Sequence, residues 1–337
     1  MADPLLTIDN LKTHFFTDEG VARAVEDVSL VVPRGKTLGL VGESGCGKSV
    51  TALSIMRLIS PPGRIVAGKI ALHDNGEEPV ELTGLSEPEM RRVRGGKISM
   101  IFQEPMTSLN PVFTIGSQIV EAIRLHQDVD KVQARKLAVE MLDKVKIPAP
   151  EQRAREYPHQ ASGGMRQRVM IAMALSCNPR LLIADEPTTA LDVTIQAQIL
   201  DLLRQLQADV GMSILIITHD LGIIAEMADE VAVMYASKVV EYAPVDRLFG
   251  TPLHPYTHGL FKSRPEMGRP KDEKLDTIEG MVPSPLRFPQ GCKFHPRCPF
   301  ARPRCKTEEP ELREIAAGGQ VRCHFAGELK WQALKNE

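Results

Sequence analysis

Residues 42–49 read Gly-Glu-Ser-Gly-Cys-Gly-Lys-Ser, the residue types and spacing of a phosphate-binding loop. Glycines let successive backbone N–H groups turn toward phosphate oxygens, and the following helix start adds a positive dipole end. We expect Lys48 to reach the terminal phosphates of a nucleoside triphosphate and Ser49 to bind Mg²⁺. Cys46 takes a variable position of the motif, either as a small packing residue or as a redox-sensitive thiol. The residues expected around the phosphates are Gly42, Ser44, Gly45, Cys46, Gly47, Lys48, Ser49 and Val50.

Two adjacent carboxylates, Asp185 and Glu186, follow the apolar run 181–184. A carboxylate at the end of a buried strand can hold Mg²⁺, and its neighbour can orient and deprotonate an attacking water. His219 follows a second apolar run, 213–217, where an imidazole either contacts a terminal phosphate or has only a structural role. Combined with the phosphate loop, this arrangement predicts hydrolysis of a nucleoside triphosphate.

Four of the six cysteines crowd into 32 residues near the end of the chain, separated by five, six and 17 residues. In a reducing compartment such a cluster is typical of a metal site rather than of disulfides. Four thiolates suit a [4Fe–4S] cluster or Zn²⁺, although the spacing matches neither the CxxC zinc pattern nor the ferredoxin run. The four are Cys292, Cys298, Cys305 and Cys323. Nearby arginines expected to offset the thiolate charge are Arg297, Arg304 and Arg322.

The elements that must position these residues follow from hydrophobic patterning. Short apolar runs typical of buried parallel strands occupy residues 37–41, 97–102, 181–184 and 213–217, and a late strand is expected over 231–235. Residues 5–41 alternate apolar and polar stretches and predict short β-strands. Helical spacing is expected over 49–59, stopped by Pro61-Pro62-Gly63, and again between 103 and 181.

Composition bounds the class of protein. The 337 residues are 43% hydrophobic and 25% charged with a net charge of −2, which predicts a soluble chain and argues against a nucleic-acid partner. We find no signal peptide and no apolar run near the roughly 18–20 residues of a membrane helix, so we expect a cytoplasmic location. Residues 252–337 hold 11 of the 25 prolines, so regular secondary structure should be sparse there.

Six motifs, in order along residues 5–250, resemble those of the ATP-binding cassette (ABC) ATPases. They are the phosphate loop at 42–49, a Q-loop glutamine at Gln103, a signature at 162–164, a Walker B pair at 185–186, a D-loop at 190–192 and a switch histidine at His219. The signature departs from the family pattern, since Ala161 replaces the leading Leu and Met165 stands where Gln follows the glycines. Ser162 and both glycines carry the phosphate contact, so the departure affects only contacts of the fifth side chain.

The resemblance implies an ATP-driven dimer of two ATPase subunits. Each signature binds the γ-phosphate of ATP held by the opposite subunit, a function implied here for Ser162, Gly163, Gly164 and Asp192. The implied Mg²⁺ ligands are Ser49, Gln103 and Asp185. The implied catalytic residues are Glu186, His219, Gln103 and Lys48. Phe15 is expected to stack on adenine, with Phe16 as the alternative and a core position open to either.

The segment His254-Pro255-Tyr256-Thr257, with residues 103–111 and 188–196, resembles the ATPases of oligopeptide and dipeptide importers. In that subfamily the region after the Q-loop meets a permease, so residues 104–125 are either a transmission surface or a plain exposed loop. The closest resemblance is to the dipeptide-importer subunit with a C-terminal [4Fe–4S] cluster. It implies that cluster on the four cysteines, with zinc or no metal as the alternatives.

We therefore predict an α/β fold: a P-loop NTPase core of the ABC type with an antiparallel β subdomain, a helical subdomain at about 104–175 and a small Cys-rich extension. Its domains are residues 1–250, the ATPase, and 251–337, the extension. The resemblance implies a second, different ATPase subunit, two permease subunits and an extracytoplasmic peptide-binding protein, at the cytoplasmic face of the membrane. Alternatives are import of nickel, glutathione or an antimicrobial peptide, a soluble non-transport ABC ATPase, or a redox sensor.

Overall fold

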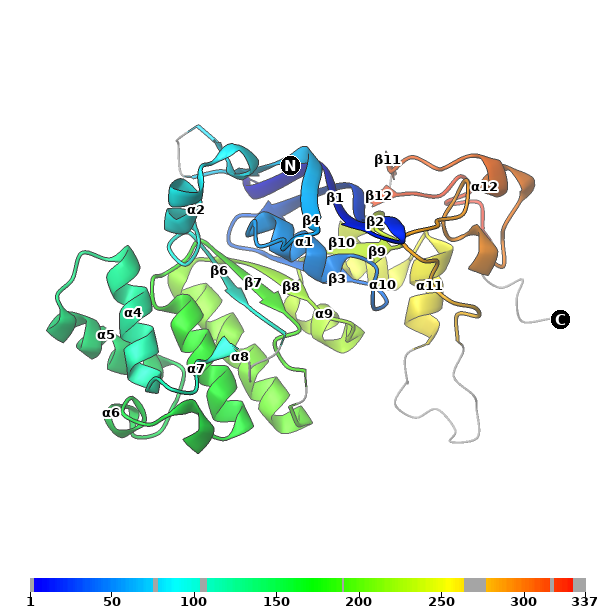
Figure 1. Cartoon of the computed structure of the whole chain (residues 1–337). Helices are drawn as coiled ribbons and strands as arrows, with labels where there is room; N and C mark the ends of the chain where they lie inside the picture. The colour runs from blue at the N-terminus through cyan, green and yellow to red at the C-terminus, as the bar shows by residue number, and fades with distance from the viewer. Residues whose placement is uncertain are drawn as a thin grey trace. The chain divides into compact units, whose positions relative to one another are not determined.

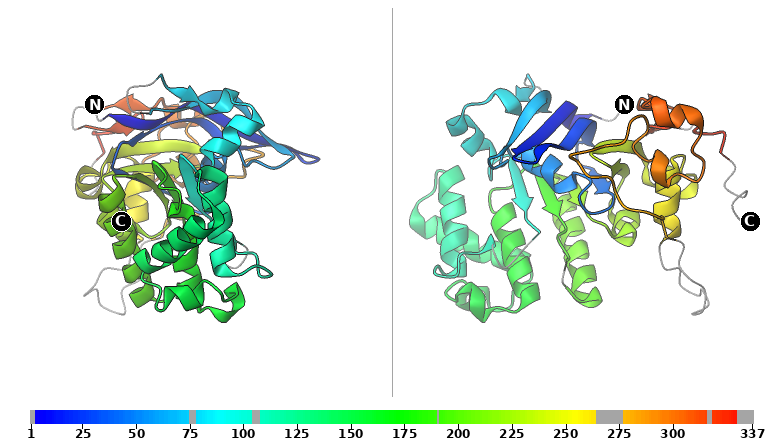
Figure 2. Two further views of the ribbon diagram at one scale, coloured as in Figure 1. Left: turned by 90° about the vertical axis from the view of Figure 1, so that its left-hand side faces the viewer. Right: turned by 45° about the vertical axis from the view of Figure 1, so that its right-hand side comes forward.

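The computed structural model describes residues 3–74, 78–103, 108–189, 191–263, 277–315 and 318–329. They form two compact units, which we describe separately: unit 1 (residues 1–6, 31–37 and 71–217) and unit 2 (residues 7–30, 38–70 and 218–337). Figures 1 and 2 show the elements of both. Within the described ranges, no helix combines the length and the apolar character needed to cross a membrane.

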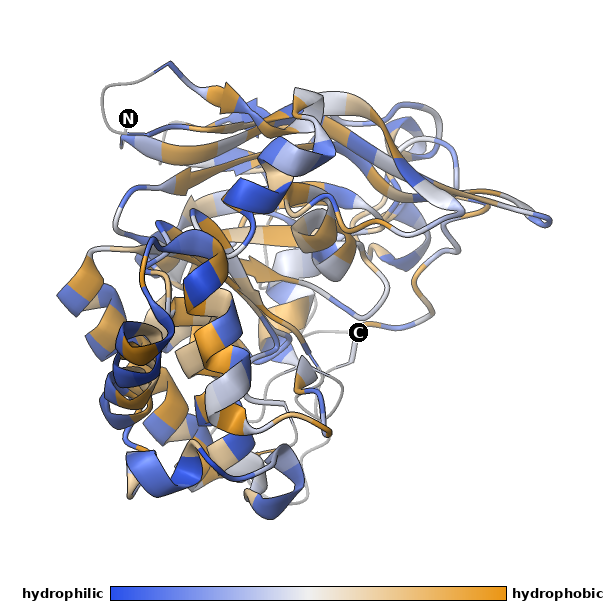
Figure 3. Cartoon of the chain, turned by 60° about the vertical axis from the view of Figure 1, so that its left-hand side comes forward, coloured by the Kyte–Doolittle hydropathy of each residue, from blue (hydrophilic) through white to orange (hydrophobic). Residues whose placement is uncertain are grey.

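Unit 1 is built on three parallel strands, with β7 paired to β6 on one side and to β8 on the other. Every residue of β7 and β8 is buried, which is why these runs are continuously apolar, and Figure 3 colours them as largely hydrophobic. The elements of unit 1 are β5 (Val80–Glu81), η1 (Leu82–Gly84), α2 (Glu87–Val93), β6 (Ile98–Ile101), α4 (Ile115–His126), α5 (Lys131–Lys144), α6 (Pro150–Arg153), η2 (Pro158–Gln160), α7 (Gly163–Leu175), β7 (Leu181–Asp185), α8 (Val193–Val210) and β8 (Ser213–Ile217).

Two of the helices between β6 and β7 begin at capping side chains. The Thr114 hydroxyl accepts the N–H of Ser117 at the start of α4, and the Asp130 carboxylate accepts two N–H groups at the start of α5. Helix α4 buries Ile115, Ile119 and Ile123, one residue per turn on a single face. The predicted helical character of this region is confirmed over the described residues.

Unit 2 contains two sheets. In one, β1 lies between β2 and β4. In the other, β3 pairs in parallel with β9, and β10, β12 and β11 follow in antiparallel order. The elements of unit 2, a few of which reach into unit 1 at one end, are β1 (Pro4–Thr17), β2 (Gly20–Pro33), β3 (Thr37–Val41), α1 (Lys48–Ile55), β4 (Gly63–Leu72), α9 (Leu221–Met227), β9 (Glu230–Tyr235), β10 (Lys238–Pro244), α10 (Val245–Gly250), α11 (Pro255–Lys262), η3 (His295–Arg297), α12 (Pro303–Thr307), β11 (Arg313–Glu314) and β12 (Gln320–Val321).

The predicted strands at 37–41, 97–102, 181–184, 213–217 and 231–235 are confirmed. The prediction of short strands over residues 5–41 was wrong in length, because β1 and β2 have 14 residues each and are separated only by Asp18 and Glu19. Helix α1 ends at Ile55 rather than at residue 59. The proline-rich end is sparse in regular structure, as predicted, although β12 still adds a strand beside β10.

Candidate functional site

The phosphate loop joins β3 to α1 in unit 2, the strand–loop–helix context that the sequence predicts. Lys48 is the first residue of α1 and is buried, with its ammonium donating to the carbonyl oxygens of Gly42 at 2.7 Å and Glu43 at 3.1 Å. Ser44 and Gly45 are exposed at the tip of the loop, and Ser49 and Val50 are half-buried. The ammonium therefore lies inside the phosphate loop, from which it is expected to reach the terminal phosphates.

At two positions of the loop, any residue other than glycine would clash with neighbouring backbone. Gly42 has a φ of 152°, and a Cβ there would lie 2.2 Å from the carbonyl oxygen of Met234. Gly47 has a φ of 106°, and its Cβ would lie 2.3 Å from the carbonyl oxygen of Ala24. Both contacts are with backbone, which cannot move aside as a side chain can, so the loop geometry requires glycine.

Cys46 is fully buried in this loop, and burial raises the pKa of its thiol. Its carbonyl oxygen accepts the N–H of Ser237 at 3.1 Å, from the turn between β9 and β10. These contacts fit the prediction of a small packing residue better than that of a reactive thiol.

Asp185 and Glu186 lie at the carboxyl end of β7 in unit 1, where Asp185 is buried with 4% of its surface exposed. The Glu186 carboxylate accepts hydrogen bonds from Gln103 Nε2 at 3.1 Å and from Thr189 Oγ1 at 2.8 Å. Its backbone has a φ of 49°, the left-handed region, and its N–H donates to the Ile217 carbonyl oxygen at 2.8 Å. Unit 1 thus brings Gln103 and Glu186 together, and strained backbone of this kind is frequent at functional sites.

The predicted signature begins α7. The Ser162 hydroxyl caps this helix by accepting the N–H of Met165 at 3.4 Å, a contact that does not depend on the Met165 side chain. Gly163 is exposed, and a Cβ there would meet nothing within 4 Å. A Cβ on Gly164 would lie 3.0 Å from Ile195 of α8. Gly163 is therefore exposed, whereas half-buried Gly164 lies against α8.

Two further contacts support the signature. Arg166 donates through Nε to the Ala161 and Pro158 carbonyl oxygens, each at 2.9 Å, and buried Gln167 donates to the Pro187 carbonyl oxygen beside Glu186. In the D-loop, Asp192 is exposed and caps α8 by accepting the N–H of Ile195 at 2.9 Å. Ala190 lies outside the described residues.

His219 and Phe15 belong to unit 2. His219 is exposed and lies two residues after the end of β8 and before α9. Phe15 is half-buried and shares a strand face with Thr13, whose hydroxyl lies 2.8 Å from that of Ser54 on α1. Phe16 points to the opposite face, where the Arg64 guanidinium stacks 4.1 Å from its ring centroid. The face directed at α1 therefore carries Phe15.

The segment after residue 250 is tied to unit 2 by a buried carboxylate. Glu241 of β10 is fully buried and accepts hydrogen bonds from Arg247 Nη1 and from the N–H groups of Leu253 and His254 at 2.8–2.9 Å. His254 in turn accepts the Tyr256 N–H at Nδ1 to cap α11, and burial lowers the pKa of His254 to about 3, so the imidazole is neutral. These contacts explain the His-Pro-Tyr sequence at the start of α11.

The four clustered cysteines line one small pocket together with His254, His295 and His324. Burial raises the pKa of Cys292 to about 11 and that of Cys298 to about 12, so their thiols are neutral at pH 7. Within the described ranges, no group of three or more His, Cys, Asp or Glu side chains is placed to hold a metal ion. The described residues therefore bring the four cysteines to one pocket without showing a metal site.

The three arginines near these cysteines have other partners. Arg297 pairs with Glu43, Arg304 donates to Glu308 at 2.6 Å, and Arg322 donates to the Val239 carbonyl oxygen at 2.9 Å. Their hydrogen-bonding partners are thus carboxylates and a carbonyl, while Arg322 still interacts electrostatically with Cys292.

Sequence reasoning missed the residues that support the motifs rather than form them. Thr189, three residues after Glu186, gave no separate signal, and the Glu43–Arg297 pair joins residues 254 positions apart. Tyr256 was marked only as part of a subfamily segment, although its hydroxyl accepts the Glu43 N–H at 2.9 Å.

Two family models match this chain. Residues 25–189 match the model described as ABC transporter, and residues 240–305 match the C-terminal region of the oligopeptide/dipeptide transporter. The second match covers Cys292, Cys298 and Cys305 and ends before Cys323.

Curated relatives match nearly the whole chain. It is 54% identical to the oligopeptide transport ATP-binding protein AppD of Bacillus subtilis (strain 168) over 95% of this chain and 96% of that protein. It is 50% identical to the dipeptide transport ATP-binding protein DppD of Escherichia coli (strain K12) over the same shares. A putative peptide import ATP-binding protein of Brucella melitensis is 52% identical, over 98% of each chain.

A solved structure also matches. The ATP-binding cassette MJ0796, a dimer in a post-hydrolysis state bound to ADP and Pi, superimposes with a TM-score of 0.63 and is 26% identical. The match covers 71% of this chain and 98% of that one.

Proposed function

Because this chain belongs to the ABC transporter family, among the ATP-binding proteins of oligopeptide and dipeptide import, we propose that it hydrolyses ATP to power peptide import through partner permease subunits. The observation that carries this proposal is identity of 50–54% to peptide import ATP-binding proteins over 95–98% of the chain. The match includes the extension after residue 240, which a general ABC ATPase model leaves out.

Hydrolysis is assigned to the residues gathered in the two units. Glu186 is the general base for the attacking water, and Gln103 and Thr189 orient its carboxylate through the hydrogen bonds described above. The phosphate-loop N–H groups and Lys48 hold the phosphates, His219 contacts the γ-phosphate, and Phe15 stacks on adenine. The substrate is ATP, and water takes the phosphoryl group.

Mg²⁺ fits the donors present. The buried Asp185 carboxylate, the Ser49 hydroxyl and the Gln103 amide oxygen are the hard oxygen ligands that this ion prefers. When bound, the ion neutralises charge on the β- and γ-phosphates. In unit 1, Asp185 would bind the ion from the end of a buried strand, with Gln103 from the same unit.

A second ATPase subunit completes the site in this proposal. Ser162 and Gly163 are exposed at the positive end of α7, where free N–H groups suit a phosphate held by another chain. Asp192, also exposed, faces outward on the neighbouring helix α8. The partner that the subfamily implies is a related but different ATPase, which makes the pair a heterodimer.

The transmission surface to the permease is proposed at residues 104–125, of which 104–107 lie outside the described residues. Val112 and Leu125 are exposed over about 70% of their surface and Phe113 over 54%. A cavity of about 890 Å³ adjoins them, lined by α4, α5 and α6. Exposed apolar side chains beside a cavity suit a docked helix of a membrane partner. The chain would then lie at the cytoplasmic face, below two permease subunits fed by an extracytoplasmic peptide-binding protein.

We further propose that Cys292, Cys298, Cys305 and Cys323 hold a [4Fe–4S] cluster. Four thiols around one pocket match in number the four thiolate ligands of such a cluster, although Zn²⁺ could take the same ligands. Metal binding would deprotonate thiols that are otherwise neutral, and so couple this segment's folding to the group. Its function would be structural, because a proline-rich segment that is sparse in regular structure gains stability from a bound group.

Two experiments test these proposals. The full chain, purified with its copurifying membrane subunits and reconstituted in vesicles, should couple ATP hydrolysis to uptake of a labelled dipeptide. Uptake of nickel or glutathione instead would reassign the substrate, and ATPase activity without membrane partners would support a soluble ATPase. Anaerobic purification with visible absorption and EPR spectra tests the cluster, and a colourless zinc-loaded chain would refute it.

A further inference from the structure

The second residue of the phosphate loop is held by the C-terminal extension. Arg297 Nη1 and Nη2 donate to the two carboxylate oxygens of Glu43 at 2.7 and 3.0 Å, a bidentate pair. The Arg297 side chain is only 4% exposed and that of Glu43 is 30% exposed. Such two-point pairing fixes direction as well as distance, so it holds Glu43 in one orientation.

The main chain of Glu43 is held as well. Its N–H donates to the Tyr256 hydroxyl at 2.9 Å, and its carbonyl oxygen accepts from the Cys46 N–H at 3.3 Å and from Lys48 Nζ at 3.1 Å. Tyr256 is fully buried, and its ring packs against that of Phe294, which lies between Cys292 and Cys298. One residue thus ties the extension to the lysine expected to bind phosphate.

A second contact reaches the loop from the same segment. We call residues 292–298 the cysteine loop. Lys293 in this loop donates to the Ala236 carbonyl oxygen at 2.9 Å, and the next residue, Ser237, donates its N–H to the Cys46 carbonyl oxygen at 3.1 Å. Lys293 and Arg297, the residues just inside the two ends of the cysteine loop, therefore support the phosphate loop at two points.

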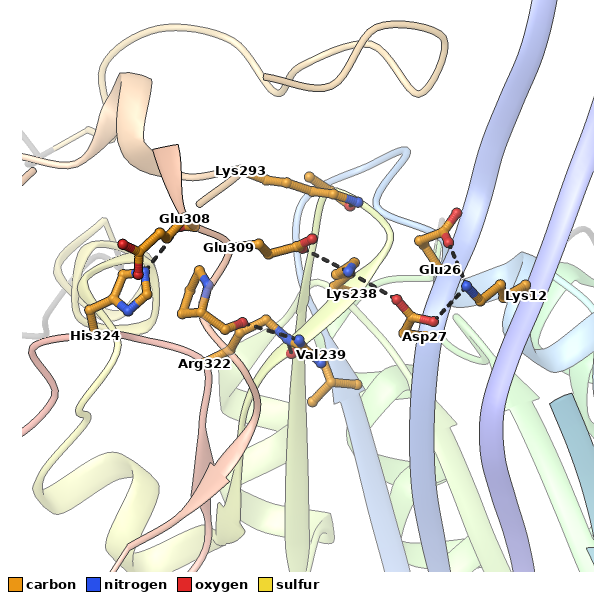
Figure 4. Close-up of polar contacts among 12 residues, drawn as sticks. Lys12, Glu26, Asp27, Lys238, Val239, Lys293, Glu308, Glu309, Arg322 and His324 are labelled. Carbon is orange, nitrogen blue, oxygen red and sulfur yellow. Dashed lines mark hydrogen bonds and ion pairs between the residues drawn. The ribbon is translucent and has the colours of Figure 1, made fainter. Parts of the chain in front are cut away.

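The extension is fixed to unit 2 by further contacts. Lys238 bridges Asp27 at 3.1 Å and Glu309 at 2.7 Å, and Lys12 extends the chain of charges from Asp27, as Figure 4 shows. Arg322 donates to the Val239 carbonyl oxygen in the same view. The cysteine loop therefore starts from a fixed base, and its contacts with the phosphate loop are not those of a loose tail.

We propose that the cysteine loop braces the phosphate loop, with Arg297 as the positioning residue, so that nucleotide affinity in this subunit depends on the folded extension. The reason is conformational entropy, because a loop with three glycines among eight residues loses much freedom when it becomes ordered. A brace that orders the loop in the nucleotide-free protein removes this entropy loss from the binding step. The inference rests on the proposed nucleotide site and is independent of which group the cysteines hold.

The test measures MgATP affinity of the full-length chain by calorimetry or a fluorescent analogue. Arg297→Ala should weaken binding about tenfold, equivalent to about 1.4 kcal/mol. Arg297→Lys should fall between this variant and the parent, because lysine cannot pair bidentately with Glu43. Tyr256→Phe removes one hydroxyl and should also weaken binding. Arg304→Ala is the matched control: Arg304 also directly precedes a cysteine but pairs with exposed Glu308, and its affinity should equal the parent's.

A double-mutant cycle separates positioning from general damage. Glu43→Ala and Arg297→Ala should each weaken the binding of MgATP. The double variant should bind MgATP no more weakly than whichever single variant has the lower affinity, because both changes remove the same ion pair. In the assembled transporter, KM for ATP should rise by a larger factor than kcat falls, because the brace acts within unit 2 whereas the base Glu186 and its partner Gln103 belong to unit 1. Parent-like affinity of a folded Arg297→Ala variant, with an unchanged melting temperature, would overturn the brace, as would additive effects. A parent chain that does not bind ATP, or binds it equally well after Lys48→Ala, would instead overturn the proposed function.

Discussion

Glu186→Gln is the sharpest perturbation of the proposed chemistry. Both hydrogen bonds to Glu186 reach one carboxylate oxygen, Oε2, and the amide oxygen of glutamine can accept the same two. The bonds change from charge-assisted to neutral, which lowers the free energy of unfolding by on the order of 1 kcal/mol. The fold and the ATP-binding residues of unit 2 should therefore survive, while the base that takes the proton from water is lost. We expect kcat to fall by about 10²–10⁴-fold.

The assay measures phosphate release by the transporter in vesicles. Two further measurements give the affinity for MgATP and the fraction of ATPase subunits present as a dimer. The variant should bind ATP with parent affinity and accumulate as a closed dimer. Thr189→Val is the matched control: it keeps the carboxylate but removes one orienting donor, so turnover should fall only about three- to tenfold. A Glu186→Gln rate within about threefold of the parent would refute the assignment of the base.

Three further predictions follow from single contacts. Lys48→Ala should weaken MgATP binding about 10- to 100-fold in calorimetry, since a buried charge-assisted donor is lost; unchanged affinity contradicts its assignment. Gly163→Ala should leave the melting temperature equal or higher, because the added methyl meets nothing within 4 Å, yet lower ATPase turnover by obstructing the partner's phosphate; parent turnover would argue against the shared site. Glu241→Ala should cost about 3–5 kcal/mol in denaturant unfolding, because Arg247 and two N–H groups lose their acceptor, and a loss below about 1 kcal/mol would show that water replaces it.

The local parts of this protein could be predicted from sequence. Strands such as β7 and β8 are buried on both faces, so their continuous apolar runs are visible without any partner. The phosphate loop is also local, since Gly42, Gly47 and Lys48 act within eight residues. The resemblance to ABC ATPases, now established by comparison, ordered these local signals into one fold.

The long-range supports could not be predicted. No periodicity or spacing in the sequence relates Glu43 to Arg297. The lengths of β1 and β2 depend on how each strand pairs with its neighbour along its whole length. The hydrogen-bond partners of Arg304 and Arg322 were also not visible in the sequence, because proximity to cysteines along the chain says nothing of direction in space. Nothing in the sequence marked Glu241, whose buried carboxylate accepts from three donors in the structure.

Because Glu43 and Arg297 lie far apart in the sequence, their ion pair can form only late in the synthesis of the chain. The ribosome releases the phosphate loop long before Arg297, Tyr256 and β12 emerge, and the β10–β12 pairing of Glu241 with Val321 closes later still. A nascent chain halted near residue 250 would carry every nucleotide-binding motif while its phosphate loop still lacked these partners. Competence to bind ATP would then be acquired near the end of translation, so an unfinished subunit would have little means of consuming ATP.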